Sequence, residues 1–161
     1  MLTIFLSVIL TPIAHADNFT VDNVNDSGAG SLRQAILDAS ELFADATITF
    51  TVGGKITLLS ELPALDNAGV LTIDGNGFKP TISGNDSVRI FTVNPGKVVN
   101  LINMKLTEGN SLGGGAVRNQ QGTLTLTDVE IFNNTALNGG GMTTLGTLTI
   151  NNSIITGNRT N

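Results

Sequence analysis

The sequence predicts an all-β fold, a parallel β-helix (a β-solenoid) in which coils of about 24 residues each hold three short strands. Threonine, glycine and asparagine together supply 58 of the 161 residues, which favours strands and turns over helices. The segment Gly122–Leu126 (GTLTL) recurs 24 residues later as Gly146–Ile150 (GTLTI), and a fixed period of this size is typical of a solenoid. From residue 47 onward, short apolar stretches alternate with turns that contain Gly and Asn.

Residues 1–16 have the pattern of a secretory signal peptide. Leu2–Leu10 is an apolar run of nine residues, shorter than the roughly 20 residues that a membrane-spanning helix needs. Pro12 ends the run, and Ala14-His15-Ala16 has the small-x-small form that signal peptidase accepts. We therefore expect cleavage after Ala16, export of the chain that begins at Asp17, and no transmembrane helix.

Residues 17–46 are predicted to form a strand and then a capping helix. Phe19–Val21 reads as the strand. Apolar residues then recur at helical spacing, which places them on one helix face: Leu32, Ala35, Ile36, Ala39, Leu42 and Phe43. Ser31 and Gln34 form a capping box, in which the Ser31 hydroxyl accepts from the N–H of Gln34 and the Gln34 side chain bonds the N–H of Ser31. We expect this helix, near residues 31–43, to lie across the N-terminal end of the solenoid.

Residues 47–161 are predicted to be the parallel β-helix repeats. The strands traced in three successive coils are Ile90–Val93, Val99–Leu101 and Met104–Leu106; then Ala116-Val117, Leu124–Leu126 and Val129–Ile131; then Met142-Thr143, Leu148–Ile150 and Ser153–Ile155. Alternation within the strands directs the side chains of Leu124, Leu126, Val129 and Ile131 inward. It directs Thr125 and Glu130 outward. We expect roughly four to five coils, stacked at about 4.8 Å.

A column of asparagines marks the repeats. Asn85, Asn110, Asn134 and Asn158 follow one another at intervals of 25, 24 and 24 residues, and we expect their side chains to stack as a hydrogen-bonded ladder. The residue before each one is Gly84, Gly109, Asn133 and Gly157. Because Gly, and less readily Asn, enters the left-handed region at low cost, we expect a left-handed bend there in every coil.

The C-terminal end of the solenoid is predicted to be open. After Asn158 the sequence reads Arg-Thr-Asn161, with no helix, proline or charged strand to cover the last coil. Leu148–Ile150 and Ser153–Ile155 carry no charge, and an uncapped parallel edge offers unpaired backbone groups to another strand. We expect the chain to be a fragment of a longer β-helix that continues in further coils, or to self-associate through this edge.

The composition excludes several classes of function. The sequence has no Cys, and its single His, His15, lies in the predicted signal peptide. The mature chain therefore lacks thiol nucleophiles, histidine bases and the usual zinc ligands. The net charge of −5, without a basic run, argues against nucleic-acid binding. We expect no cofactor and no required metal.

Six charged residues are the candidates for chemistry on the outer surface: Asp74, Asp86, Arg89, Lys105, Asp128 and Glu130. Asp128 and Glu130 are two residues apart, and on one strand a carboxylate pair of this kind could bind calcium or carry out acid–base catalysis. Lys105 precedes Glu130 by 25 residues, about one coil, so an ordinary surface ion pair is the competing interpretation. Asp74-Gly-Asn-Gly77 lacks the further ligands of a calcium loop and is interpreted as a tight turn.

The repeats resemble a known family. Gly114-Gly115-Ala116-Val117 matches the GGA[ILV] motif of polymorphic outer membrane protein repeats. Ile82-x-x-Asn85, Ile131-x-x-Asn134 and Ile155-x-x-Asn158 are similar to its FxxN-type motif, with isoleucine in place of Phe. Gly30–Ile36 resembles the CSLREA-type segment found at the head of many such proteins. The resemblance implies a right-handed parallel β-helix of the pectin-lyase-like superfamily.

Two functions of different classes follow from this resemblance. The first is a non-catalytic secreted or cell-surface segment of the adhesin or passenger type, located outside the cell or on a bacterial outer membrane. It would present a polar face rich in Thr and Asn to a cell-surface glycan or protein. The alternative is a polysaccharide-active, pectate-lyase-like enzyme or a piece of one. We favour the first because the mature chain has no His, Tyr or Trp with which to build carbohydrate subsites.

Overall fold

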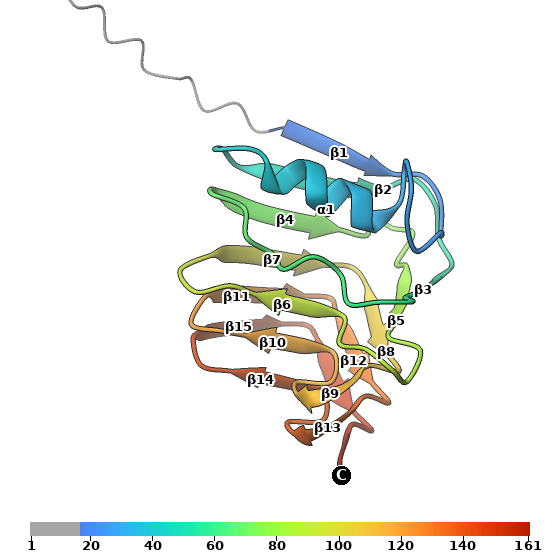
Figure 1. Ribbon diagram of the computed structural model, residues 1–161, viewed down its shortest axis with the longest axis vertical. Helices are drawn as coiled ribbons and strands as arrows, with labels where there is room; N and C mark the ends of the chain where they lie inside the picture. The colour runs from blue at the N-terminus through green and yellow to red at the C-terminus, as the bar shows by residue number, and fades with distance from the viewer. Residues whose placement is uncertain (1–16) are drawn as a thin grey trace, which may run out of the picture.

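The computed structural model describes residues 17–161, and the predicted signal peptide lies outside the described residues. The described chain is a parallel β-solenoid of about six turns with one short helix (Figure 1). The predicted all-β, parallel β-helix fold is therefore confirmed. Its four sheets run along the length of the solenoid, and each coil contributes at most one strand to each sheet.

The bounds of the strands follow the four sheets. The six-stranded sheet is ordered β1 (Asp17–Val21), β2 (Ala46–Phe50), β4 (Val70–Asp74), β7 (Val98–Ile102), β11 (Thr123–Thr127) and β15 (Thr147–Asn151). The five-stranded sheet is ordered β3 (Lys55–Thr57), β5 (Thr81–Ser83), β8 (Lys105–Thr107), β12 (Glu130–Phe132) and β16 (Ile154–Thr156). The two three-stranded sheets consist of β6 (Phe91–Val93), β10 (Val117–Asn119) and β14 (Met142–Thr144), and of β9 (Asn110–Gly113), β13 (Thr135–Asn138) and β17 (Arg159–Thr160).

The three strands predicted in each of the later coils are present, and the coil centred on β11 shows the correspondence well. β10, β11 and β12 coincide with or adjoin the predicted strands. The sequence missed the fourth short strand, represented by β9, β13 and β17. In β13 only Ala136 is fully buried, and so this strand lacks the apolar alternation from which a strand is predicted.

The core is a stack of aliphatic side chains inside the coils. Leu124, Leu126, Val129 and Ile131 are fully buried, as alternation predicted. Leu124 pairs in register with Val99 on one side and Leu148 on the other, so equivalent positions stack along the solenoid. Full burial of such a side chain stabilises the fold by about 1.5–3 kcal/mol. The repeat period and the core are therefore two expressions of one pattern.

The solenoid begins at β1, which is the first strand of the six-stranded sheet and pairs in parallel with β2. α1 (Leu32–Ser40) is inserted in the chain between these two strands and packs beside both of them (Figure 1). It buries the apolar side chains of Leu32, Ala35, Ile36 and Ala39. The helix thus closes the side of the first coil, whereas the sequence predicted that it would lie across the end.

The helix is shorter than the sequence predicted. It ends at Ser40, and Phe43 is 97% exposed, so the expectation that Phe43 belongs to the buried face was wrong. Leu42 packs against the core but is only partly buried. Because β2 begins at Ala46, the chain must leave the helix early to reach the start of that strand. Burial in the first coil therefore overrides the helical spacing at Phe43.

At the C-terminal end of the described structure, β14, β15, β16 and β17 are each the outermost strand of a sheet. Ile150, Ile154 and Ile155 are 45%, 57% and 42% exposed there. Their counterparts one coil earlier, Leu126 and Ile131 among them, are fully buried. The last coil therefore presents apolar side chains that a further layer would bury.

Candidate functional site

The Gly114-Gly115-Ala116-Val117 motif forms a tight corner that leads into β10. Gly114 has a φ of +67°, which favours glycine. The backbone N–H of Ala116 donates to the carbonyl of Gly141 in the next coil (2.8 Å), and its own carbonyl accepts from Phe91 in the preceding coil (2.9 Å). The motif thus holds successive coils together at close approach.

The asparagine column differs from the ladder that the sequence predicted. Asn134 is fully buried and bonds Asn158, but Asn110 pairs in register with Thr135 and lies one position out of the column. Gly109 takes the aligned place, and its N–H donates to Asn134 Oδ1 (2.7 Å). Asn85 is exposed at the other end. The equal spacing of asparagines was misleading because Asn110 is the first residue of β9.

The left-handed bends are also partly displaced from the predicted positions. Asn133 and Gly157 have φ values of +54° and +63°, as expected. In the coil between them and Gly84, the left-handed residue is Glu108 (+54°) rather than Gly109, because register aligns Glu108 with Asn133. A carboxylate residue in this conformation gave no glycine signal for the sequence to reveal.

The helix cap is half of the predicted capping box. The Ser31 hydroxyl accepts from the backbone N–H of Gln34 (3.2 Å), as expected. The Gln34 side chain instead donates to Asp38 Oδ1 (2.7 Å), one turn further along the helix. The N–H of Ser31 donates to the carbonyl of Gly28 (3.2 Å), so the return bond from Gln34 is not needed.

Arg33, in the segment that resembles the CSLREA motif, connects two loops. Its guanidinium bonds Asp26 Oδ1 (2.8 Å) and the carbonyls of Ser60 (2.8 Å) and Glu61 (2.7 Å). Asp26 in turn accepts from the backbone N–H of Leu59 (3.0 Å). Arg33 is therefore a structural clamp within the first coils, a role that sequence spacing did not reveal.

The outer face of the six-stranded sheet is rich in Thr and Asn. Register aligns two outward columns along it: Asn18, Thr47, Thr72, Asn100, Thr125 and Thr149, and beside it Thr20, Thr49, Asp74, Ile102, Thr127 and Asn151. Only Asp74 is charged among these twelve residues. Neighbouring positions in a column are about 4.8 Å apart. This surface is a regular array of hydroxyl, methyl and amide groups.

The five-stranded sheet, in contrast, presents ion pairs. Lys105 Nζ lies 3.3 Å from Glu130 Oε2, the pair that the 25-residue spacing predicted. Lys79 Nζ, which the sequence did not connect with this site, lies 2.9 Å from Glu130 Oε1. Hydrogen bonding from Lys79, with a smaller contribution from Lys105, lowers the pKa of Glu130. Glu130 is therefore a neutralised surface carboxylate.

A second carboxylate on this side is held in the same manner. Glu108 Oε2 accepts from Lys55 Nζ (2.6 Å) and from the Ser83 hydroxyl (2.5 Å). These two hydrogen bonds, that of Lys55 first, lower the pKa of Glu108. Both glutamates consequently favour the ionised state, which makes neither a ready proton donor.

The remaining candidate carboxylates do not converge on one site. Asp128 has a φ of +56° in the bend before β12, so it is not on one strand with Glu130 as the pair hypothesis required. Asp74 Oδ1 accepts from Asn76 N (2.8 Å) and Asn103 Nδ2 (3.0 Å), which makes it part of a turn. Asp86 lines a separate surface hollow with Arg159. Within residues 17–161, no group of three or more acidic or His side chains could hold a metal ion.

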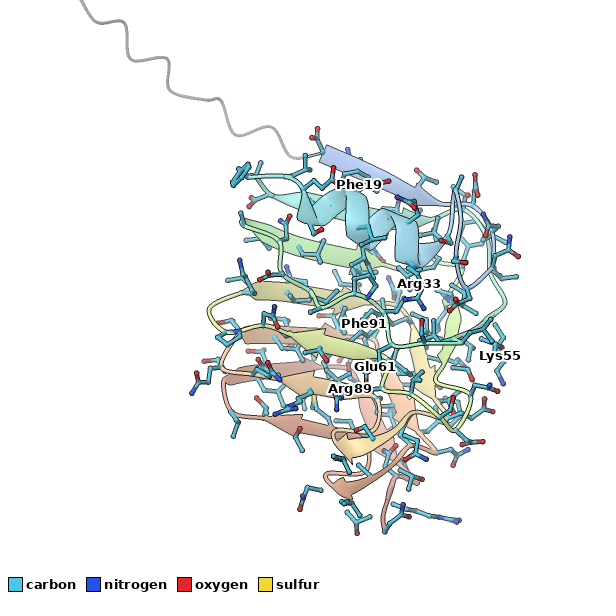
Figure 2. All side chains as sticks on the ribbon, viewed as in Figure 1. Phe19, Arg33, Lys55, Glu61, Arg89 and Phe91 are labelled. Atoms are coloured by element: carbon cyan, nitrogen blue, oxygen red, sulfur yellow. The ribbon has the colours of Figure 1, made fainter. Side chains whose placement is uncertain are left out.

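Arg89 is a buried cation, with only 9% of its surface exposed. Its Nε donates to the carbonyls of Gly113 (3.3 Å) and Gly114 (3.2 Å), and its Nη1 lies 3.7 Å from Glu61 Oε2. Figure 2 shows Arg89 and Glu61 close together beside β6. Burial is the main cause that lowers the pKa of Arg89, opposed by Glu61. Arg89 supports the glycine corner of the next coil.

No protein-family model, curated protein or solved structure shows a significant match to this chain. Among residues 17–161, no helix is long and apolar enough to cross a membrane. The fold and the surfaces above are therefore the basis on which function must be argued.

Proposed function

We propose that this chain is a non-catalytic β-solenoid segment of a secreted or cell-surface protein, of the adhesin or passenger type. The parallel coils and the GGA[ILV] corner support a relationship to polymorphic outer membrane protein repeats and the pectin-lyase-like superfamily. The pattern of residues 1–16 supports export. The function is to hold a binding surface outside the cell on a rigid column.

The observation that carries this proposal is the outer face of the six-stranded sheet. Eleven of the twelve residues in its two aligned columns are uncharged, and most are Thr or Asn. Hydroxyl and amide groups hydrogen-bond neutral sugars or polar protein surfaces, and threonine methyl groups add apolar contact. The preferred partner is therefore a neutral cell-surface glycan or an uncharged protein face.

The electrostatics of the glutamates support a non-catalytic function. General acid catalysis by a carboxyl group needs a raised pKa, so that the group still holds its proton at neutral pH. Lys79 and Lys105 lower the pKa of Glu130, and Lys55 and Ser83 lower that of Glu108. These are the most perturbed carboxyl groups on the surface, and both are shifted away from acid catalysis.

Binding and cleavage can be separated in one experiment. The exported chain would be applied to an array of neutral and acidic glycans, and in parallel incubated with a uronate polymer while new reducing ends and unsaturated products are measured. We expect binding to neutral glycans and no cleavage. Cleavage that is lost in an Asp128→Asn or Arg89→Lys variant would replace this function with the lyase alternative.

A further inference from the structure

A surface hollow of about 380 Å³ lies between the end of the four-residue strands and the third sheet. Its wall includes side chains from β9, β10, β13 and β14 and from the loop after β14: Leu112, Arg118, Asn119, Asn138, Thr143 and Leu145. This volume is at the small end of the range for ligand pockets. The hollow is separate from the six-stranded face, so what it binds goes beyond the function proposed above.

The charge inventory singles out this hollow. All eight Lys and Arg residues of the chain lie within residues 17–161. Six of them have a carboxylate oxygen within 4.0 Å: Arg33, Lys55, Lys79, Arg89, Lys97 and Lys105. Of the described residues, only Arg118 and Arg159 have no such partner, and each lines a surface hollow.

The two hollows differ in what surrounds the arginine. Arg159 shares its hollow with the carboxylate of Asp86, which offsets the positive charge. The hollow of Arg118 has no acidic side chain in its wall. In a chain of net charge −5, Arg118 is therefore an uncompensated cation in a concave, carboxylate-free site.

Arg89 reinforces the site from below. It fixes the wall by donating to the carbonyls of Gly113 and Gly114, and its Nη1 donates to Thr92 Oγ1 (3.2 Å). Thr92 is the register partner of Arg118 on the neighbouring strand. The proximity of the Arg118 charge also contributes to lowering the pKa of Arg89. Two guanidinium groups thus make this region positive, and the buried one is immobilised.

We propose that this hollow binds the carboxylate of one acidic sugar residue at the end of a glycan. The planar Arg118 guanidinium matches a carboxylate in two-point geometry. Asn138 and Thr143 offer hydrogen bonds to sugar hydroxyls, and the exposed side chains of Leu112 (76%) and Leu145 (74%) can contact the C–H faces of the ring. A single free cation suits one carboxylate, whereas a polyanion such as nucleic acid needs several cations.

The test compares two probes that differ only by the acidic sugar. Binding of 3′-sialyllactose and of lactose to the exported chain would be measured by calorimetry, with Arg118→Ala and Arg159→Ala variants as the matched pair. We expect sialyllactose to bind and lactose not to bind. Arg118→Ala should weaken binding at least about tenfold, the effect of losing a hydrogen bond to a charged group, while Arg159→Ala leaves it unchanged.

Arg118→Lys provides a second variant that keeps the charge. It should bind sialyllactose more weakly than the wild type and more tightly than Arg118→Ala, because the ammonium group lacks the two-point fork. Equal binding of both sugars, no binding of either, or an equal loss in Arg159→Ala would overturn the proposal. Binding of a glutamate-rich peptide in preference to the sugar would overturn the glycan assignment. None of these results alters the test of the six-stranded face, which uses neutral glycans.

Discussion

Asn158 lies one coil below Asn134, and its side-chain oxygen accepts hydrogen bonds from both the Nδ2 (2.9 Å) and the backbone N–H (3.0 Å) of Asn134. Asn134 Nδ2 also donates to the carbonyls of Leu106 (3.1 Å) and Phe132 (3.0 Å). With Gly109 N–H bonded to its Oδ1, the buried amide of Asn134 connects three successive coils. Buried polar groups of this kind are costly to leave unpaired.

Asn134→Ala should therefore destabilise the solenoid by roughly 1–3 kcal/mol, because it leaves buried backbone groups without partners. Asn110→Ala is the matched control, since Asn110 is only half-buried and its amide bonds one carbonyl, that of Asp86. Its effect should stay within about 0.5 kcal/mol. Urea unfolding followed by circular dichroism measures both, and equal losses in the two variants would show that the aligned position is not special.

Ile131 and Glu130 are neighbours on β12 with opposite environments. Ile131→Asp should unfold the solenoid, because it places an unpaired charge among stacked aliphatic side chains at a cost of several kcal/mol. Glu130→Ala should cost no more than about 1 kcal/mol, because its ion pairs are at the surface. Thermal unfolding distinguishes them. A folded Ile131→Asp chain would contradict the assigned inward face.

Three adjacent glycines give a sharper test of how closely the coils approach. A Cβ at Gly115 would overlap the carbonyl oxygen of Gly140 in the next coil, and one at Gly114 would overlap that of Val117. A Cβ at Gly113 would meet nothing closer than 4.0 Å. We expect Gly115→Ala to cost about 1–3 kcal/mol or more and Gly113→Ala to be tolerated. A reversed order of melting temperatures would show that the corner is placed incorrectly.

The lysine-paired glutamates predict an acid-dependent loss of stability. Their pKa values are lowered on folding, so their contribution is present above the unfolded glutamate pKa of about 4.3 and is lost as pH falls through the lower folded values. The difference in urea midpoint between the wild type and a Glu108→Gln/Glu130→Gln double variant should shrink as the pH is lowered from neutral through this range. A difference that stays constant would refute the role of the lysines.

The sequence predicted what depends on period and alternation, and it failed where a contact crosses coils without either. Glu130 and Lys105 could be paired by counting one coil. Lys79 could not, because it lies in a turn at a φ of +45° and reaches Glu130 from two coils away. The burial of Arg89 was equally hidden, since its acceptors are the backbone carbonyls of a glycine corner 24 and 25 residues later.

The hollow around Arg118 shows the same limit for function. Arg118 follows the GGA[ILV] motif, and nothing in its local sequence marks it as different from the other cations. Its distinction is that six other Lys and Arg residues find carboxylates across coils, which only the packed register reveals. Period and composition therefore predict the scaffold, while the binding surfaces depend on how its charges are partnered.

The most direct test of the proposed function is to place one lysine on each of the two large faces and measure glycan binding. Thr125→Lys adds a charge to the centre of the uncharged six-stranded face, and Thr156→Lys adds one to the exposed edge of the five-stranded sheet. On the same array of neutral glycans, we expect Thr125→Lys to lose binding and Thr156→Lys to keep it, with both chains folded by circular dichroism. Retained binding in Thr125→Lys, or no binding by the unaltered chain, would contradict the proposal that this face is the contact surface.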